Sequence, residues 1–136
     1  MEDRGIKFIL PLKSLKSKHK YFILNLNNYR NAHYQSLNAS KVDFCYQMNA
    51  RYPEKIKPIT GKIRTEYTIF SKDKRLFDLP NVGSIVQKYF EDWLVSRGVI
   101  KDDNITVIPE CSYYWGMVDK ENPRCEAVIR LLEGEL

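Results

Sequence analysis

The stretch NVGSIVQKYFEDWLVSR, residues 81–97, decides the fold class of this chain. Its apolar residues recur at every third or fourth position, which places them on one wide stripe of an α-helix. These residues are Val82, Ile85, Val86, Tyr89, Phe90, Trp93 and Leu94. Gly98 follows directly and is typical of a helix end. The sequence therefore predicts a long amphipathic helix over 81–97.

The segments on either side predict a second helix and several strands. Residues 36–51 carry an imperfect helical stripe that ends at Tyr52-Pro53, and residues 62–70, KIRTEYTIF, alternate in the manner of a strand. Short apolar runs predict further strands at 6–12, 20–26, 105–116 and 124–132. Together these elements predict an α+β fold in which a mixed sheet packs against two main helices, in a single domain of residues 1–136.

The connections are predicted from their turn residues. A lysine-rich turn separates residues 6–12 from 20–26, which indicates two strands or a hairpin, and residues 118–123 form the expected hairpin turn before the last strand. The asparagine-rich stretch 27–31 is predicted to be a loop, because asparagine side chains bond nearby backbone groups. Pro109 indicates a bulge or an edge position.

Composition excludes several classes of protein. With 136 residues, 43% hydrophobic and 29% charged, the chain has room for one folded core and is neither fibrous nor wholly disordered. It has no apolar run long enough for a membrane span, and it begins with the acidic stretch 1–4 rather than a basic signal peptide, so we expect a cytoplasmic protein. The three cysteines are widely spaced, which argues against a disulfide framework and a zinc site.

Basic residues cluster in two places. The net charge is +5, and the clusters consist of Lys13, Lys16, Lys18 and Lys20, and of Lys72, Lys74 and Arg75. Such clusters attract polyanions by counterion release, although a lysine run also occurs as an ordinary solvated surface. The histidines, His19 and His33, lie in polar contexts that argue against a histidine-based catalytic pair.

Polar residues follow the face of the predicted helix opposite its apolar stripe. The members of this seam are Asn81, Ser84, Lys88 and Asp92, with Asp78 just before the helix and Asp102-Asp103 just after it. A helix of this length spans about 25 Å, so the acidic groups at its two ends meet only if the following chain returns alongside it. The alternative interpretation is structural: Asp78 caps the helix, and Asp102-Asp103 are turn residues.

The segment that begins at Lys88 resembles the RusA-like Holliday junction resolvases. The matching residues occur in the same order as in that family: Lys88, Asp92, Leu94, Gly98, Asp102 and Asp103. Upstream, residues 77–81 resemble the family's D-x-D-N motif, and residues 26–31 resemble its N-terminal loop. The resemblance covers about residues 20 to 130. Two departures are that Pro80 replaces the second aspartate and that about four extra residues lie within 82–87.

The resemblance implies a Mg²⁺ site, with Mn²⁺ as a substitute, that includes Asp78 and Asp103. Because Pro80 has no carboxylate, the third ligand is open among several polar residues. The candidates are Asp102, Glu66, Asn81 and Ser84. The metal polarises the phosphate and activates a water, and Lys88 neutralises the charge that grows on the phosphoryl oxygens. The resemblance therefore implies Asp78, Lys88 and Asp103 as catalytic residues.

The implied function is a Mg²⁺-dependent, structure-selective endonuclease that cleaves four-way junctions and branched DNA during recombination and repair. Besides the two basic clusters, Asn28 and Arg30 are the expected DNA contacts. The family implies a homodimer in a bacterial host, encoded by a phage or prophage, and we expect the apolar run 107–117 to form the interface strand. Two alternatives stay open: a junction-binding protein whose catalysis Pro80 has weakened, and a basic protein-interaction domain without a nucleic-acid role.

Overall fold

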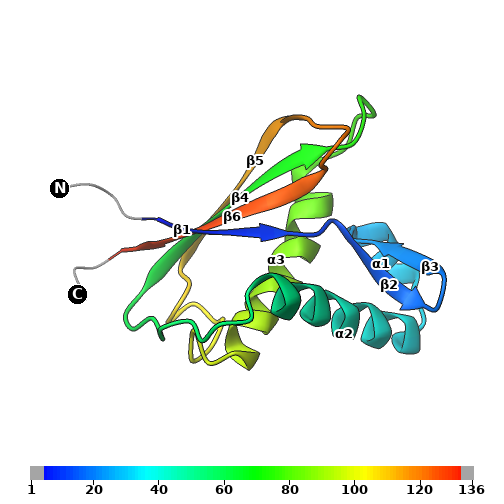
Figure 1. Ribbon diagram of the computed structural model, residues 1–136. Helices are drawn as coiled ribbons and strands as arrows, with labels where there is room; N and C mark the ends of the chain where they lie inside the picture. The colour runs from blue at the N-terminus through cyan, green and yellow to red at the C-terminus, as the bar shows by residue number, and fades with distance from the viewer. Residues whose placement is uncertain (1–4, 133–136) are drawn as a thin grey trace.

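The protein is described by a computed structural model of residues 5–132, which confirms the α+β expectation (Figure 1). A four-stranded mixed sheet has the order β1 (Ile6–Leu10), β6 (Arg124–Leu131), β4 (Ile63–Ser71) and β5 (Glu110–Val118). The helices lie on one side of this sheet. Residues 1–4, on which the signal-peptide expectation rests, lie outside the described residues. Within the described part of the chain, each helix is too short or too polar to cross a lipid bilayer.

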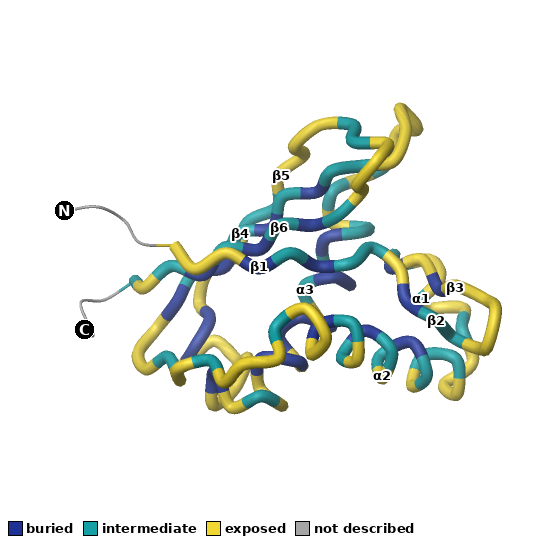
Figure 2. The backbone as a smooth tube through the Cα atoms, viewed as in Figure 1, coloured by how far each residue is buried: buried dark blue, intermediate teal, exposed yellow. Residues whose placement is uncertain are grey.

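The central strand β4 has the alternation that its sequence predicts. Ile63, Thr65, Tyr67 and Ile69 are buried, and the residues between them are half-buried on the opposite face. The neighbouring strand β6 alternates in the same way, as Figure 2 shows. One face of the sheet is therefore apolar and packs against the helices, as is usual where helices cover a single face.

Both predicted long helices are present as α2 (Tyr34–Arg51) and α3 (Leu79–Ser96). The apolar stripe of α3 faces the sheet, where the ring of Phe90 lies 5.3 Å from that of Phe8 and 6.1 Å from that of Tyr67. Phe44 of α2 meets Tyr89 edge-on at 5.5 Å. Full burial of such side chains contributes about 1.5–3 kcal/mol each, so this layer of aromatic residues holds α3 in place.

Residues 6–12 and 20–26 each contain a strand, β1 and β3 (Lys20–Ile23), as one of the two interpretations predicts, but the alternative hairpin between them is wrong. The lysine-rich segment between them is itself strand β2 (Lys13–Ser17), which forms a separate antiparallel hairpin with β3. β1 instead pairs antiparallel with β6 from the other end of the chain. Ser14 is completely buried within β2, and a short polar strand of this kind lacks the apolar alternation that would have predicted it.

The hairpin expected around residues 118–123 is also wrong, because β4 separates β5 from β6 in the sheet. Helix α3 carries the chain from β4 to β5, and such a crossover makes the two strands parallel. The chain then crosses the end of β4, where the Asp119 backbone N–H donates to the Ser71 carbonyl at 2.7 Å. β5 begins directly after Pro109 and forms an edge of the sheet, so the edge position predicted from Pro109 is confirmed.

Candidate nucleic-acid cleft

The asparagine-rich stretch predicted to be a loop forms a short helix, α1 (Leu26–Asn31). Asn25 precedes it as N-cap, and its side-chain oxygen accepts from the Asn28 backbone N–H at 2.8 Å. The Asn28 side-chain amide donates back to the Ile23 carbonyl at 2.9 Å. The asparagines thus satisfy backbone groups at the helix start, which is the same chemistry that favours loops.

Asn81 in the first turn of α3 holds α1 against that helix. Its Oδ1 accepts from the Leu26 backbone N–H at 3.1 Å. The two upstream segments that resemble resolvase motifs, 26–31 and 77–81, are therefore neighbours in space. The same hydrogen bond gives Asn81 a structural role, in contrast to its predicted role as a metal ligand.

Asp78 occupies the N-cap position of α3, but its side chain makes no capping hydrogen bond to the described residues. The carboxylate is exposed and has no ion-pair partner within residues 5–132. A carboxylate at this place is favoured by the partial positive charge of the helix N-terminus. The structural alternative, a side-chain cap, is therefore not realised, and the Asp78 oxygens are available to a ligand.

Asp102 and Asp103 lie beyond the other end of α3. The two oxygens of Asp102 accept from the Asp103 backbone N–H at 2.7 Å and from the Asn104 side-chain amide at 2.9 Å, as expected of a turn residue. Because α3 has 18 residues and rises about 1.5 Å per residue, about 27 Å of helix separates Asp78 from this turn. The next strand, β5, begins at the end of the sheet away from Asp78, where Glu110 pairs with Arg64. The chain therefore does not return Asp103 to Asp78.

The predicted metal site does not form within one copy of the chain. Among residues 5–132, no three histidine, cysteine, aspartate or glutamate side chains lie close enough to hold a metal ion. Glu66 faces away from the helices and pairs with Arg64 at 2.9 Å and Arg130 at 3.1 Å. Ser84 donates to the Pro80 carbonyl at 2.6 Å. A site with both Asp78 and Asp103 consequently requires two copies of the chain.

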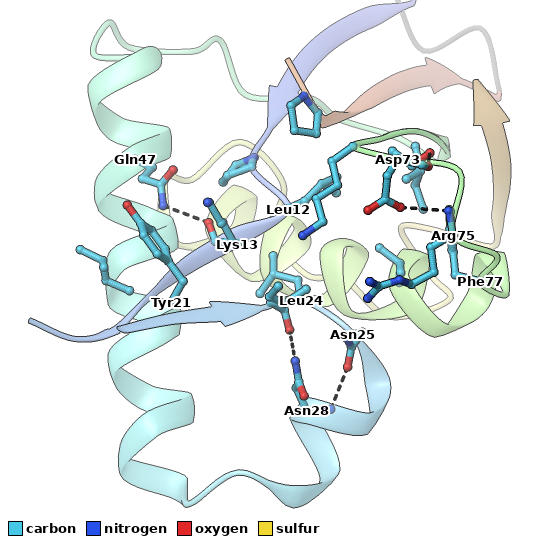
Figure 3. A pocket seen from close by; sticks show the side chains of 18 of the residues that line it. Leu12, Lys13, Tyr21, Leu24, Asn25, Asn28, Gln47, Asp73, Arg75 and Phe77 are labelled. Carbon is cyan, nitrogen blue, oxygen red and sulfur yellow. Dashed lines mark hydrogen bonds between the residues drawn. The ribbon is translucent and has the colours of Figure 1, made fainter. Parts of the chain in front are cut away.

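Several of the predicted DNA contacts do come together around one cleft of about 710 Å³. The cleft lies between the β2–β3 hairpin, α2 and the loop 71–77 that leads to Asp78 (Figure 3). The predicted contacts among its lining residues are Lys13, Asn28, Lys72 and Arg75. We call this the basic cleft. The other predicted contacts do not line it: Lys16, Lys18, Lys20, Arg30 and Lys74.

The cleft carries more free positive than negative charge. The head groups of Lys13, Lys72 and Arg75 form no ion pair with the described residues. Asp43 is engaged by the Leu15 backbone N–H at 2.7 Å, and Gln47 also donates to this carboxylate at 2.8 Å.

Asp73 accepts from the Arg75 backbone N–H at 3.0 Å, so it shapes the loop while the guanidinium extends toward the cleft (Figure 3). Both carboxylates that line the cleft thus hold backbone in place but keep their negative charge, so the three cations exceed the two anions by one.

Exposed apolar side chains line the same cleft, a feature that the sequence analysis missed. Tyr21 is 52% exposed, Tyr46 72% and Leu76 95%. The ammonium of Lys13 lies 4.3 Å from the centre of the Tyr21 ring, which is cation–π geometry. In the sequence, the signal for this feature is the mixture of basic and aromatic residues in 18–21. A core strand with a charged outer face has the same pattern, so the pattern alone does not indicate an exposed aromatic ring.

A second missed residue is Glu91, which interrupts the apolar stripe of α3. Only 5% of its surface is exposed, and its carboxylate accepts from the Tyr67 hydroxyl at 2.8 Å. Burial, with smaller contributions from the negative charges of Asp103 and Asp92, raises the pKa of Glu91 to about 7. Glu91 does not line the basic cleft, so we assign it to the packing of α3 against the sheet.

Comparison with models of known protein families gives no match to this chain, and no curated protein matches it. The resemblance to resolvases therefore stays a prediction from sequence motifs, and the geometry described above is the independent support for a function.

Proposed function

We propose that this protein is a Mg²⁺-dependent, structure-selective endonuclease that binds and cleaves branched DNA as a homodimer. The observation that carries the proposal is the basic cleft, which gathers Lys13, Lys72 and Arg75 from separate segments of the chain. The unpartnered carboxylate of Asp78 follows the loop that forms one wall of this cleft. Free cations in a cleft, with a free carboxylate next in sequence to its wall, suit a site where a phosphodiester meets a metal-binding group.

Separation of the acidic residues is the reason for proposing a shared site. Asp78 lies near the ends of β4 and β5, which meet at the pair Ser71 and Val118, whereas Asp103 precedes the start of β5. Two β5 edges related by a two-fold axis run antiparallel. In that arrangement the start of β5 in one copy lies beside the end of β5 in the other, which brings Asp103 of one copy toward Asp78 of its partner.

The edge strand β5 has the surface that such a contact needs. It pairs with β4 on one side, and its other side lies at the edge of the sheet. Tyr114 is 49% exposed, Trp115 55% and Met117 56%, within the run 107–117 predicted as an interface. Exposed edge strands with large apolar side chains are templates for pairing with another chain.

Mixing two inactive variants tests this shared site. We expect Asp78→Asn and Asp103→Asn each to abolish cleavage of a synthetic four-way junction in Mg²⁺ while retaining junction binding. After the two variants are unfolded and refolded together, about half of the dimers are mixed, and each mixed dimer holds one intact site. The mixture should therefore regain about a quarter of the wild-type active sites and produce nicks in single strands.

The control is each variant refolded alone, which should stay inactive. An inactive mixture would contradict the shared site. Near-normal cleavage by either single variant would remove that aspartate from the reaction. Binding of the junction without cleavage by the wild-type chain in Mg²⁺ or Mn²⁺ would instead support the second candidate, a junction-binding protein, which the replacement of an aspartate by Pro80 favours.

A further inference from the structure

We propose that the basic cleft receives an unpaired nucleotide, with its base against the exposed apolar side chains and its phosphates on the surrounding cations. This inference rests on the proposed DNA-binding function and adds what part of the DNA the cleft recognises. The features that carry it are the size of the cleft, the position of its cations and the exposed rings and aliphatic side chains that line it.

The volume fits a ligand of nucleotide size rather than a duplex. Pockets for small ligands and cofactors occupy roughly 300–1,000 Å³, and this cleft of about 710 Å³ lies within that range. A DNA duplex presents its phosphates outward and keeps its bases stacked inside. It therefore leaves the apolar side chains of a concave site without a partner, whereas an extruded or unpaired base fills that site.

The excess of positive charge around the cleft favours an anionic ligand. Lys13 comes from the hairpin, and Lys72 and Arg75 from the loop on the other side of the cleft, so cations flank it from two elements. The carboxylates of Asp43 and Asp73 accept hydrogen bonds from backbone N–H groups and offset this charge only in part. A strand that enters between the two elements meets a cation on either side, which suits consecutive phosphates of a backbone.

The exposed side chains supply the surface for the base. Tyr21 is half-exposed in β3, and Leu76 is almost fully exposed in the loop. Stacking of a base on an aromatic ring is sequence-tolerant, because every base has a π-face. Lys13 already lies over the Tyr21 ring, so a nucleotide stacked on the opposite face leaves this cation–π contact intact. Unpaired nucleotides occur where branched DNA is opened. A cleft that binds any unpaired base therefore selects DNA by its structure and not by its base sequence.

Binding to two matched duplexes tests the inference. One duplex is fully paired, the other carries one extra unpaired 2-aminopurine, and both are titrated without Mg²⁺ to prevent cleavage. We expect the bulged duplex to bind the wild-type chain more tightly and its fluorescence to be quenched by stacking. Tyr21→Ala should weaken binding of the bulged duplex at least about fivefold and abolish the quenching, while binding of the paired duplex changes less than about twofold.

Matched variants separate the ring from other effects. Tyr21→Phe keeps the ring and should behave like the wild type, and Leu76→Ser tests the other wall at a position too exposed to affect folding. Tyr34→Ala removes an exposed tyrosine on α2 that does not line the cleft, and it should leave both affinities unchanged. Equal affinity for the two duplexes, with unquenched fluorescence, would overturn the inference and leave DNA binding intact. If neither duplex nor a four-way junction binds, the proposed function fails as well.

Discussion

At the scale of single residues, Glu91 is the clearest departure from its sequence environment. A carboxyl group in the apolar stripe of α3 is stable there because it is hydrogen-bonded by Tyr67 and favours its protonated form. Its pKa of about 7 compares with 4.5 for an exposed glutamate. The folded state therefore binds more protons than the unfolded chain between these two pH values.

This difference predicts the pH dependence of stability. Since the folded state holds the extra proton, the free energy of unfolding should fall by about 3 kcal/mol as the pH rises from about 4.5 to about 7, and then level off. Glu91→Gln keeps an acceptor for the Tyr67 hydroxyl and should remove this contribution. Urea unfolding of both proteins at several pH values measures it, and parallel curves for the two would contradict the prediction.

At the scale of elements, one side-chain hydrogen bond joins α1 to α3. Asn81 supplies the acceptor for the Leu26 backbone N–H. Asn28 of α1 lines the cleft, and its side-chain amide joins α1 to the Ile23 carbonyl of β3. A six-residue helix is too short to be stable alone, so its position depends on such contacts.

Asn81→Ala should therefore loosen α1 without unfolding the domain. We expect a loss of about 1 kcal/mol of stability, because the Leu26 N–H loses its partner, and faster amide hydrogen exchange confined to residues 26–31. Asn81→Asp retains an acceptor oxygen at the same place and serves as control. Wild-type exchange rates in Asn81→Ala would show that packing alone positions α1.

At the scale of the whole molecule, the proposed association with DNA should depend on the distribution of charge. The net charge is +5, and Lys13, Lys72 and Arg75 gather around one cleft. We expect junction affinity to fall steeply with salt, with a slope of log Kd against log salt of about 2.7 for each cleft, because three cations neutralise three phosphates and each contributes about 0.9. Titrations between low and physiological salt measure this slope. Replacing all three residues by glutamine should make it shallower, and a slope near zero in the wild type would exclude binding through phosphates.

The sequence by itself determined the elements whose patterns are local and strong. Hydrophobic periodicity predicts α3, α2 and β4 to within a few residues. The reason is that the spacing of apolar residues shows which side of a single segment is buried. The sequence also places Lys13, Lys72 and Arg75 in basic clusters, and the phosphate contacts expected of such clusters stay a prediction.

Tertiary structure decided the order of the strands, the helix at 26–31 and the geometry of the sites. β1 pairs with β6 from the opposite end of the chain, and no local pattern encodes a partner that distant. The resemblance to resolvases implied one metal site with Asp78 and Asp103, but the length of α3 and the parallel return of β5 separate these residues within one copy. The cleft likewise arises only where hairpin, helix and loop meet, because concavity belongs to the packing of several elements and not to any one segment.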